Sequence, residues 1–176
     1  MILGFGNLTT MPLQIEYMTS DEYSIQATNT QIAIAAIVIP SITRIIATSI
    51  WGHLFDPFNF FLVRGLASCI QLVAIVSFFF ADSILGIYLG AFGYGLALAG
   101  GNVNWSLWVT KFAPVGQESK YMSVHTFTAG IRGLVAPFIG FYMIQFFSIQ
   151  GWALFGSLLV GLSICLLYPI SQFARR

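Results

Sequence analysis

The sequence predicts an all-α integral membrane protein, because long apolar segments are combined with very few charges and no strand-like alternation. Of its 176 residues, 57% are hydrophobic and 7% are charged, whereas soluble domains carry roughly 25% charged residues. This shortage of charge excludes a soluble globule, a disordered chain and a nucleic-acid-binding protein. The apolar segments also run well past the roughly 10 alternating residues of a barrel strand, so we expect helices.

Charges and turn residues divide the chain into six apolar segments, which we expect to form a single six-helix membrane domain over residues 1–176. A spanning helix needs about 20 apolar residues. The predicted spans are approximately residues 2–18, 28–54, 60–81, 83–112, 123–147 and 151–173. The first segment is short and has no basic flank, and the last two are separated only by residues 148–150. We expect a tight hairpin there.

Basic residues fall on one side of this predicted topology. The loops and terminus on that side carry Arg64, Lys111, Lys120, Arg175 and Arg176. The opposite side carries Glu16, Asp21, Glu22 and Asp82 and no Lys or Arg. Since Lys and Arg accumulate in cytoplasmic loops, the split predicts a cytoplasmic C-terminus. Six spans return the N-terminus to the same side, so we expect both termini in the cytoplasm and the protein in a plasma or inner membrane.

Small residues predict where the helices approach one another closely in lipid. Gly86 and Gly90 are four residues apart in the fourth segment, and Gly133 and Gly140 belong to a small-residue stripe in the fifth. We interpret these glycines as helix-packing positions.

The second and fifth segments share an internal pattern. Arg44 precedes Gly52 by eight residues, and Arg132 precedes Gly140 by eight residues. These segments are the middle members of two successive sets of three. The pattern therefore favours two three-helix repeats, an arrangement found inside six-helix transporter halves.

The loop after the second segment carries a motif. It reads GHLFDPFN over residues 52–59, and the next basic residue is Arg64. This loop resembles the signature of the major facilitator superfamily, in which a Gly is followed after three residues by an Asp and then by basic residues. Gly52 and Asp56 match the signature, whereas Pro57 stands at the first basic position and Arg64 arrives late. The KFAP segment at 111–114 and the Gly/Pro-rich stretch at 129–140 are similar to the family as well.

The resemblance implies the C-terminal six-helix half of a twelve-helix transporter, with the substrate site between the halves near the middle of the membrane. The expected partners are then the lipid bilayer, a small-molecule substrate, and either an N-terminal half or a second copy. The short first segment suggests a chain that begins inside a helix, as a truncated or split gene would produce. The resemblance also implies that Asp56 belongs to a latch at the cytoplasmic side; the alternative is a solvated turn residue before Pro57.

Two arginines, Arg44 and Arg132, lie inside predicted spans. At 1.5 Å per residue both are about 12–13 Å inside the membrane, where a charge costs at least about 2.5–3.5 kcal/mol unless it is paired, hydrated or snorkelling. Each arginine could bind an anion, namely a substrate carboxylate or phosphate or a carboxylate of the other half. Alternatively, each snorkels to the headgroups. The resemblance favours pairing between the halves.

Polar residues in the fourth segment are candidates for a substrate cavity. Asn102, Trp105 and Ser106 share one helix face through their i, i+3 and i+4 spacing. Asn7 and Gln14 are candidates in the first segment by the same logic. The alternative is that the Asn side chains bond neighbouring helices and the Trp residues belong to the interfacial belt.

No enzyme signature is present, and we expect no cofactor and no metal site. His53 and His125 lack Cys or acidic residues at ligand spacing. The predicted function is transmembrane transport of a small solute, as the C-terminal half of a secondary active transporter that works by alternating access with an N-terminal half. The alternative is a stand-alone or remnant six-span protein with a dimerising or assembly role.

Overall fold

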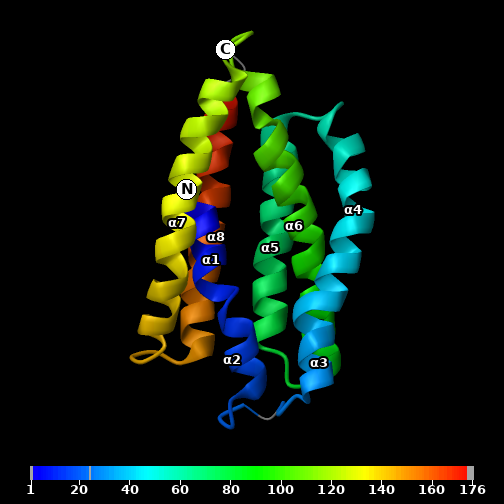
Figure 1. Ribbon diagram of the computed structural model, residues 1–176, viewed down its shortest axis with the longest axis vertical. Helices are drawn as coiled ribbons and strands as arrows, with labels where there is room; N and C mark the ends of the chain where they lie inside the picture. Colours follow the sequence, from blue (N-terminus) through cyan, green and yellow to red (C-terminus); the bar gives the residue numbers. More distant parts are fainter. Residues whose placement is uncertain (1, 24, 174–176) are drawn as a thin grey trace.

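The computed structural model describes residues 2–23 and 25–173, with side chains placed through residue 167 (Figure 1). Within these ranges the chain is helical and contains no strand. In chain order the elements are α1 (Ile2–Thr10), α2 (Leu13–Thr19), α3 (Asn29–Ala33), the π-helix η1 (Ile34–Val38), α4 (Ile39–Phe55), α5 (Phe60–Phe79), α6 (Ile84–Phe112), α7 (Glu118–Met143) and α8 (Ile149–Phe173).

Four helical stretches are long and apolar enough to cross a membrane, which is typical of a multi-pass membrane protein. They are Asn29–Phe55, Phe60–Phe79, Ile84–Phe112 and Ile149–Leu167. The prediction of six spans is therefore supported for the second, third, fourth and sixth segments. The first segment is broken at Met11 and Pro12 into helices of nine and seven residues, and α7 begins with the polar sequence ESKYMSVH.

Pro40 explains the irregular start of the helical segment Asn29–Phe55. Pro40 has no N–H to donate to the carbonyl one turn earlier, and its ring crowds that turn. The chain adopts the π-helix η1 directly before it, over Ile34–Val38. The wider π turn accommodates the proline without ending the helix, so α3, η1 and α4 form one continuous rod.

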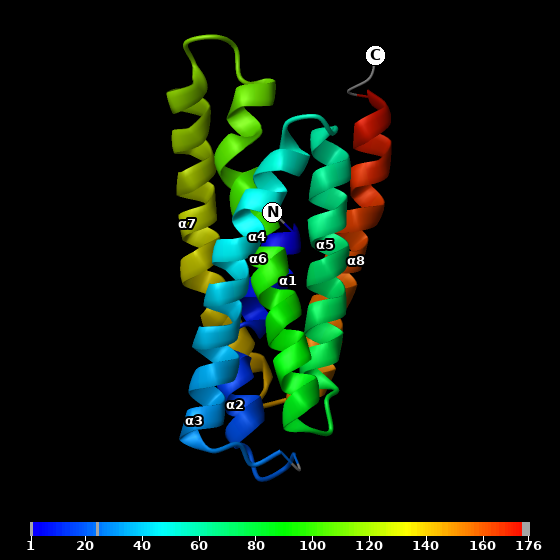
Figure 2. The same ribbon diagram turned by 90° about the vertical axis from the view of Figure 1, so that its right-hand side faces the viewer.

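The helices pack in two sets, one around α6 and the other around α1. α6 packs against α4 and α5, α1 packs against α7 and α8, and α5 packs against α8. In Figure 2, α4 and α7 lie on one side of the bundle and α5 and α8 on the opposite side. The connections α4–α5 and α6–α7 lie at one end of the bundle, and α2–α3, α5–α6 and α7–α8 lie at the other (Figures 1 and 2).

Glycines make several of these helix contacts possible. A Cβ at Gly90 would lie 2.7 Å from the Phe78 Cα of α5, and one at Gly86 would lie 2.8 Å from the Ala81 Cβ. A Cβ at Gly140 would overlap the Thr9 carbonyl group, so α7 touches the α1 backbone there. By contrast, no described atom lies within 4 Å of a Cβ placed at Gly133. Gly90 and Gly140 thus lie at close contacts between helices, Gly86 lies against the α5–α6 connection, and Gly133 lies at no such contact.

Candidate functional site

Two adjacent cavities lie between the helices, where polar side chains from four helices meet. The first, which we call the Asn7 cavity, has a volume of about 150 Å³. Its lining comes from α1, α5, α6 and α7 and comprises Leu3, Gly4, Asn7, Arg64, Ala67, Ser68, Gln71, Ala97, Leu98, Gly101, Asn102, Trp105 and Arg132.

The second cavity, which we call the His125 cavity, has a volume of about 240 Å³. It is lined by Phe60, Arg64, Asn104, Trp105, Trp108 and His125. Arg64 and Trp105 line both cavities, so the two spaces meet at these side chains.

Helix α5 supplies the polar wall of the Asn7 cavity. Arg64, Ser68 and Gln71 follow i, i+4 and i+7 spacing and therefore share one helix face. Val63 and Ala67, on a neighbouring face, are buried in a cluster with Trp51 and Phe55. Apolar packing on that face thus fixes the rotation of α5 and turns the polar residues into the cavity.

Hydrogen bonds fix the positions of the Gln71 and Ser68 side chains in this wall. Gln71 Nε2 donates to Asn7 Oδ1 at 3.0 Å, which joins α5 to α1. Ser68 Oγ donates to the carbonyl of Arg64 one turn earlier, at 2.8 Å. The Ser68 hydroxyl proton is therefore used within the helix, while Arg64 lines both cavities.

The Asn7 cavity carries two positive charges and no negative one among its lining residues. Arg64 reaches it from α5 and Arg132 from α7, and neither an Asp nor a Glu lines either cavity. The Arg132 guanidinium lies directly against α1, because a Cβ at Gly4 would overlap it. Arg132 Nε is buried without a hydrogen-bond partner among the described residues.

The His125 cavity is aromatic with several unused polar atoms. The His125 ring lies 5.5 Å from the Trp105 ring and 5.3 Å from the Trp108 ring, measured between centroids. Asn104 Nδ2 donates to the carbonyl of Gly100 at 2.7 Å. Asn104 Oδ1, Trp108 Nε1 and His125 Nε2 have no partner in the described part of the chain. Both a donor and acceptors thus remain available in this space.

The structure brings together some of the residues predicted for a substrate cavity. Asn7, Asn102 and Trp105 line the Asn7 cavity. Ser106 is exposed and lines neither cavity. Gln14 is buried in α2, where its Nε2 has no partner among the described residues.

Sequence reasoning missed the contributions of α5 and of His125. The polar face formed by Arg64, Ser68 and Gln71 was detectable from its spacing, but the loop motif assigned Arg64 to the connection before the helix. The structure places Arg64 inside α5, one turn after Asn59, whose side chain caps the helix by accepting from the Phe61 N–H at 2.8 Å. The contact of His125 with two tryptophans joins distant helices and leaves no local signal.

The other predicted residues lie outside the cavities. Arg44 is exposed near the middle of the Asn29–Phe55 rod. Gly52 has no described atom within 4 Å of a Cβ placed on it, and Asp56 is exposed directly after α4. At that end Lys111 Nζ donates to the carbonyls of Phe55 at 2.6 Å and Phe58 at 3.0 Å. The lysine, rather than Asp56, therefore joins α6 to the α4–α5 connection.

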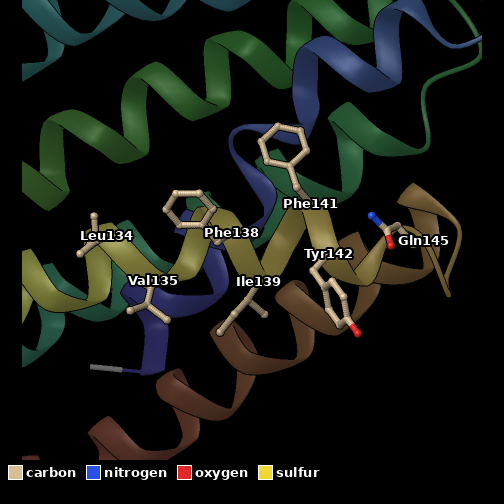
Figure 3. A pocket seen from close by; sticks show the side chains of 7 residues that line it. All are labelled: Leu134, Val135, Phe138, Ile139, Phe141, Tyr142 and Gln145. Atoms are coloured by element: carbon tan, nitrogen blue, oxygen red, sulfur yellow. The ribbon is translucent and has the colours of Figure 1, made fainter.

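A further groove, of about 720 Å³, lies on α7 (Figure 3). Its lining is apolar except at one end, and comprises Leu134, Val135, Phe138, Ile139, Phe141, Tyr142 and Gln145. Figure 3 shows Leu134, Phe138 and Phe141 on one side of the helix and Val135, Ile139 and Tyr142 on the other. Without buried charges or converging donors, this groove is suited to packing against lipid or another helix, not to recognising a polar solute.

Among the described residues, no group of three His, Cys, Asp or Glu side chains is placed to hold a metal ion. Comparison of the chain with protein-family models, with curated proteins and with solved structures finds no match.

Proposed function

We propose that this chain is the C-terminal half of a secondary active transporter of the major facilitator type and that it moves a small solute by alternating access together with an N-terminal half. The observation that carries the proposal is the Asn7 cavity. A polar cavity with two arginines, built from four helices of an otherwise apolar bundle, is costly in a membrane unless it is used. Intramembrane ionisable residues typically mark a substrate or ion pathway.

The packing pattern supports the proposed repeats. The first three helical segments are α1–α2, α3–α4 and α5, and the last three are α6, α7 and α8. If the two sets are exchanged, α6 takes the place of α1, α7 that of α4, and α8 that of α5. The contacts of α6 with α4 and α5 then correspond to those of α1 with α7 and α8, and the contact between α5 and α8 maps onto itself. This is the behaviour expected of two three-helix repeats within a six-helix half. In this proposal α1–α2 and α7 complete six spans.

The side of the bundle formed by α4 and α7 is the proposed docking face for the N-terminal half. Arg44 lies on it near the middle of its rod, among exposed Ile42, Ile45 and Ile46. A charge at that depth costs about 2.5–3.5 kcal/mol on insertion scales unless the side chain is paired or extends to the membrane surface. A carboxylate or carbonyl from a partner half would supply such a pair.

Thiol accessibility tests whether the Asn7 cavity is a water-filled pathway. Cys69 and Cys165 are both exposed and free, so the starting point is the Cys69→Ser, Cys165→Ser chain in native membranes. Asn102→Cys places a thiol at the cavity, and Leu89→Cys places a matched thiol on an exposed apolar position of the same helix. We expect a water-soluble thiosulfonate to label Asn102→Cys from one side of the membrane and Leu89→Cys from neither. Equally slow labelling of both variants would contradict a solute pathway.

Transport itself is tested with the other half. DNA upstream of the Met1 codon that encodes six further spans would supply the partner, and vesicles containing both halves should take up solute while vesicles containing one half should not. A promoter and ribosome-binding site directly before Met1, together with a thermally robust monomer, would favour the stand-alone alternative.

The proposed orientation places the α4–α5 and α6–α7 connections and the C-terminus in the cytoplasm. Lys111 and Lys120 lie at this end, while Asp21, Glu22 and Asp82 lie at the other. A reporter that is active only in the cytoplasm should be active when it is fused after Arg176. Activity only of an exported reporter at that position would reverse the topology.

A further inference from the structure

We propose that the Asn7 cavity binds the oxyanion group of a small soluble solute, a carboxylate or a phosphate, between Arg64 and Arg132. The transported solute would therefore be an organic or inorganic anion. This inference rests on the proposed function, whose site it assigns to a substrate class.

The lining of the Asn7 cavity is positively charged. Arg64 and Arg132 both line this space of about 150 Å³, and no acidic residue does. The six acidic residues of the chain are all located at helix ends or in connections, and they are Glu16, Asp21, Glu22, Asp56, Asp82 and Glu118. Because two like charges in a partly dry space repel each other and lose hydration, an anion is the ligand that relieves both costs.

The lining of the Asn7 cavity also offers hydrogen-bond donors that suit an oxyanion. A guanidinium is always charged and offers a planar fork that matches the oxygens of a carboxylate or phosphate. Arg132 Nε is buried without a partner among the described residues, so this donor is available to a ligand. The hydrogen bond from Gln71 occupies Asn7 Oδ1, which leaves the Asn7 amide N–H groups free to donate. An oxyanion would accept hydrogen bonds from Arg64, Arg132 and Asn7.

The size of the cavity also fits a small ligand. A volume of about 150 Å³ is large enough for an oxyanion group. The His125 cavity adds about 240 Å³ beside Arg64, and its walls include Phe60, Trp105 and Trp108. A compact apolar or aromatic body could extend from the oxyanion into that space. Small organic acids fit this combination.

A phospholipid headgroup carries the same oxyanion chemistry. The cavity has walls from four helices, α1, α5, α6 and α7, and its volume of about 150 Å³ holds no acyl chain, which favours a soluble solute over a lipid. The experiment therefore separates these two sources.

The test is isothermal titration calorimetry of the full chain in phosphatidylcholine nanodiscs. The probes are sodium phosphate, sodium benzoate and, as a matched cation with the same ring, benzylammonium chloride. We expect saturable binding of an anion and none of benzylammonium. Arg64→Gln and Arg132→Gln should each weaken anion binding about 10- to 100-fold, since each removes a charge-assisted hydrogen-bonding group. Arg44→Gln, which removes an arginine outside the cavity, should change it less than about two-fold.

Gly4→Ala provides a variant that keeps both charges. A Cβ at this position overlaps the Arg132 guanidinium, so the arginine must move and anion binding should weaken. Absence of binding of both anions to the folded wild-type chain, or equal weakening by Arg44→Gln, would overturn the proposal. So would a more than ten-fold loss of affinity when phosphatidylglycerol replaces phosphatidylcholine, because a lipid headgroup would then occupy the site.

Failure here is distinguishable from failure of the transporter proposal. Calorimetry measures equilibrium binding to this chain alone, whereas labelling of Asn102→Cys measures access of water to the cavity. Labelling without anion binding would leave a solute pathway with another substrate class.

Discussion

Arg44 and Arg132 occupy matching positions in the sequence but different environments in the structure. Each precedes a glycine by eight residues in the middle segment of a three-segment set. Arg132 lines the Asn7 cavity together with Arg64 and lies against Gly4 of α1. Arg44 is exposed, and its neighbours Ile45 and Ile46 are 72% and 63% exposed. Position along a helix is therefore a poor guide to the surroundings of a charged side chain.

The face that each helix turns toward its neighbour explains the difference. On α4 the buried positions are Thr43, Ala47, Trp51 and Phe55, which follow one another at four-residue spacing. This helix packs against α6. Arg44 is one residue past this stripe and so is rotated by about 100° from it. On α7 the buried positions are Ala136 and Gly140, and Arg132 precedes them at the same four-residue spacing. The stripe that packs α7 onto α1 therefore also carries its arginine inward.

The largest effect is expected where α7 meets α1. Gly140→Leu should lower the free energy of unfolding of the chain by about 3 kcal/mol, the upper end of typical overpacking costs. The new side chain would overlap the Thr9 backbone, which cannot move aside as a side chain can. The measurement is denaturation by sodium dodecyl sulfate in mixed micelles. The substitution should also remove the difference between Arg132 and Arg44, since α7 can then no longer hold Arg132 in the cavity.

Gly133→Leu is the matched control on the same helix. No described atom lies within 4 Å of a Cβ at this position, so its unfolding free energy should change by less than about 0.5 kcal/mol, as is usual for surface substitutions. Equal destabilisation by the two variants would show that helix propensity, not the α1–α7 contact, controls the result.

Replacing each arginine with Leu tests the comparison directly. In the chain without its proposed partner, Arg132→Leu should raise the free energy of unfolding by about 1–3 kcal/mol, because it removes one of two facing, unpaired charges. Arg44→Leu should change it by less than about 1 kcal/mol in micelles, since an exposed arginine can extend to the micelle surface. Destabilisation by Arg132→Leu would reveal an acidic or carbonyl partner within this chain and would contradict the anion site.

Much of the helical organisation could be predicted from the sequence, because apolar length and turn residues act locally. The segments 60–81 and 83–112 correspond closely to α5 and α6. The break at Pro12 and the π-helix before Pro40 were harder to anticipate, since a proline in a membrane helix is accommodated in several ways. The composition of the cavity was predicted only in part. Asn7, Asn102 and Trp105 were identified by face, but the pairing of Arg64 with Arg132 depends on how α5 and α7 are rotated by distant contacts.

The smallest expected effect concerns the end of the helix that carries Arg44. Lys111 Nζ donates to the carbonyls of Phe55 and Phe58 and lies 4.3 Å from the centroid of the Phe55 ring. These contacts place a positive charge at the C-terminus of α4, where it interacts favourably with the helix dipole. Lys111→Met should lower the free energy of unfolding by about 1 kcal/mol, the sum of exposed cation–π and helix-dipole contributions.

Lys120→Met is the control for this change, because Lys120 is also an exposed lysine at the same end of the bundle. It should leave the free energy of unfolding within about 0.5 kcal/mol of the wild-type value. The Lys111 variant should retain anion binding, since neither cavity includes Lys111, whereas Arg132→Gln should lose binding. If Lys111→Met weakened anion binding as much as Arg132→Gln does, the end of α4 would be coupled to the cavity, and the separation between an inward-facing and an outward-facing arginine would fail.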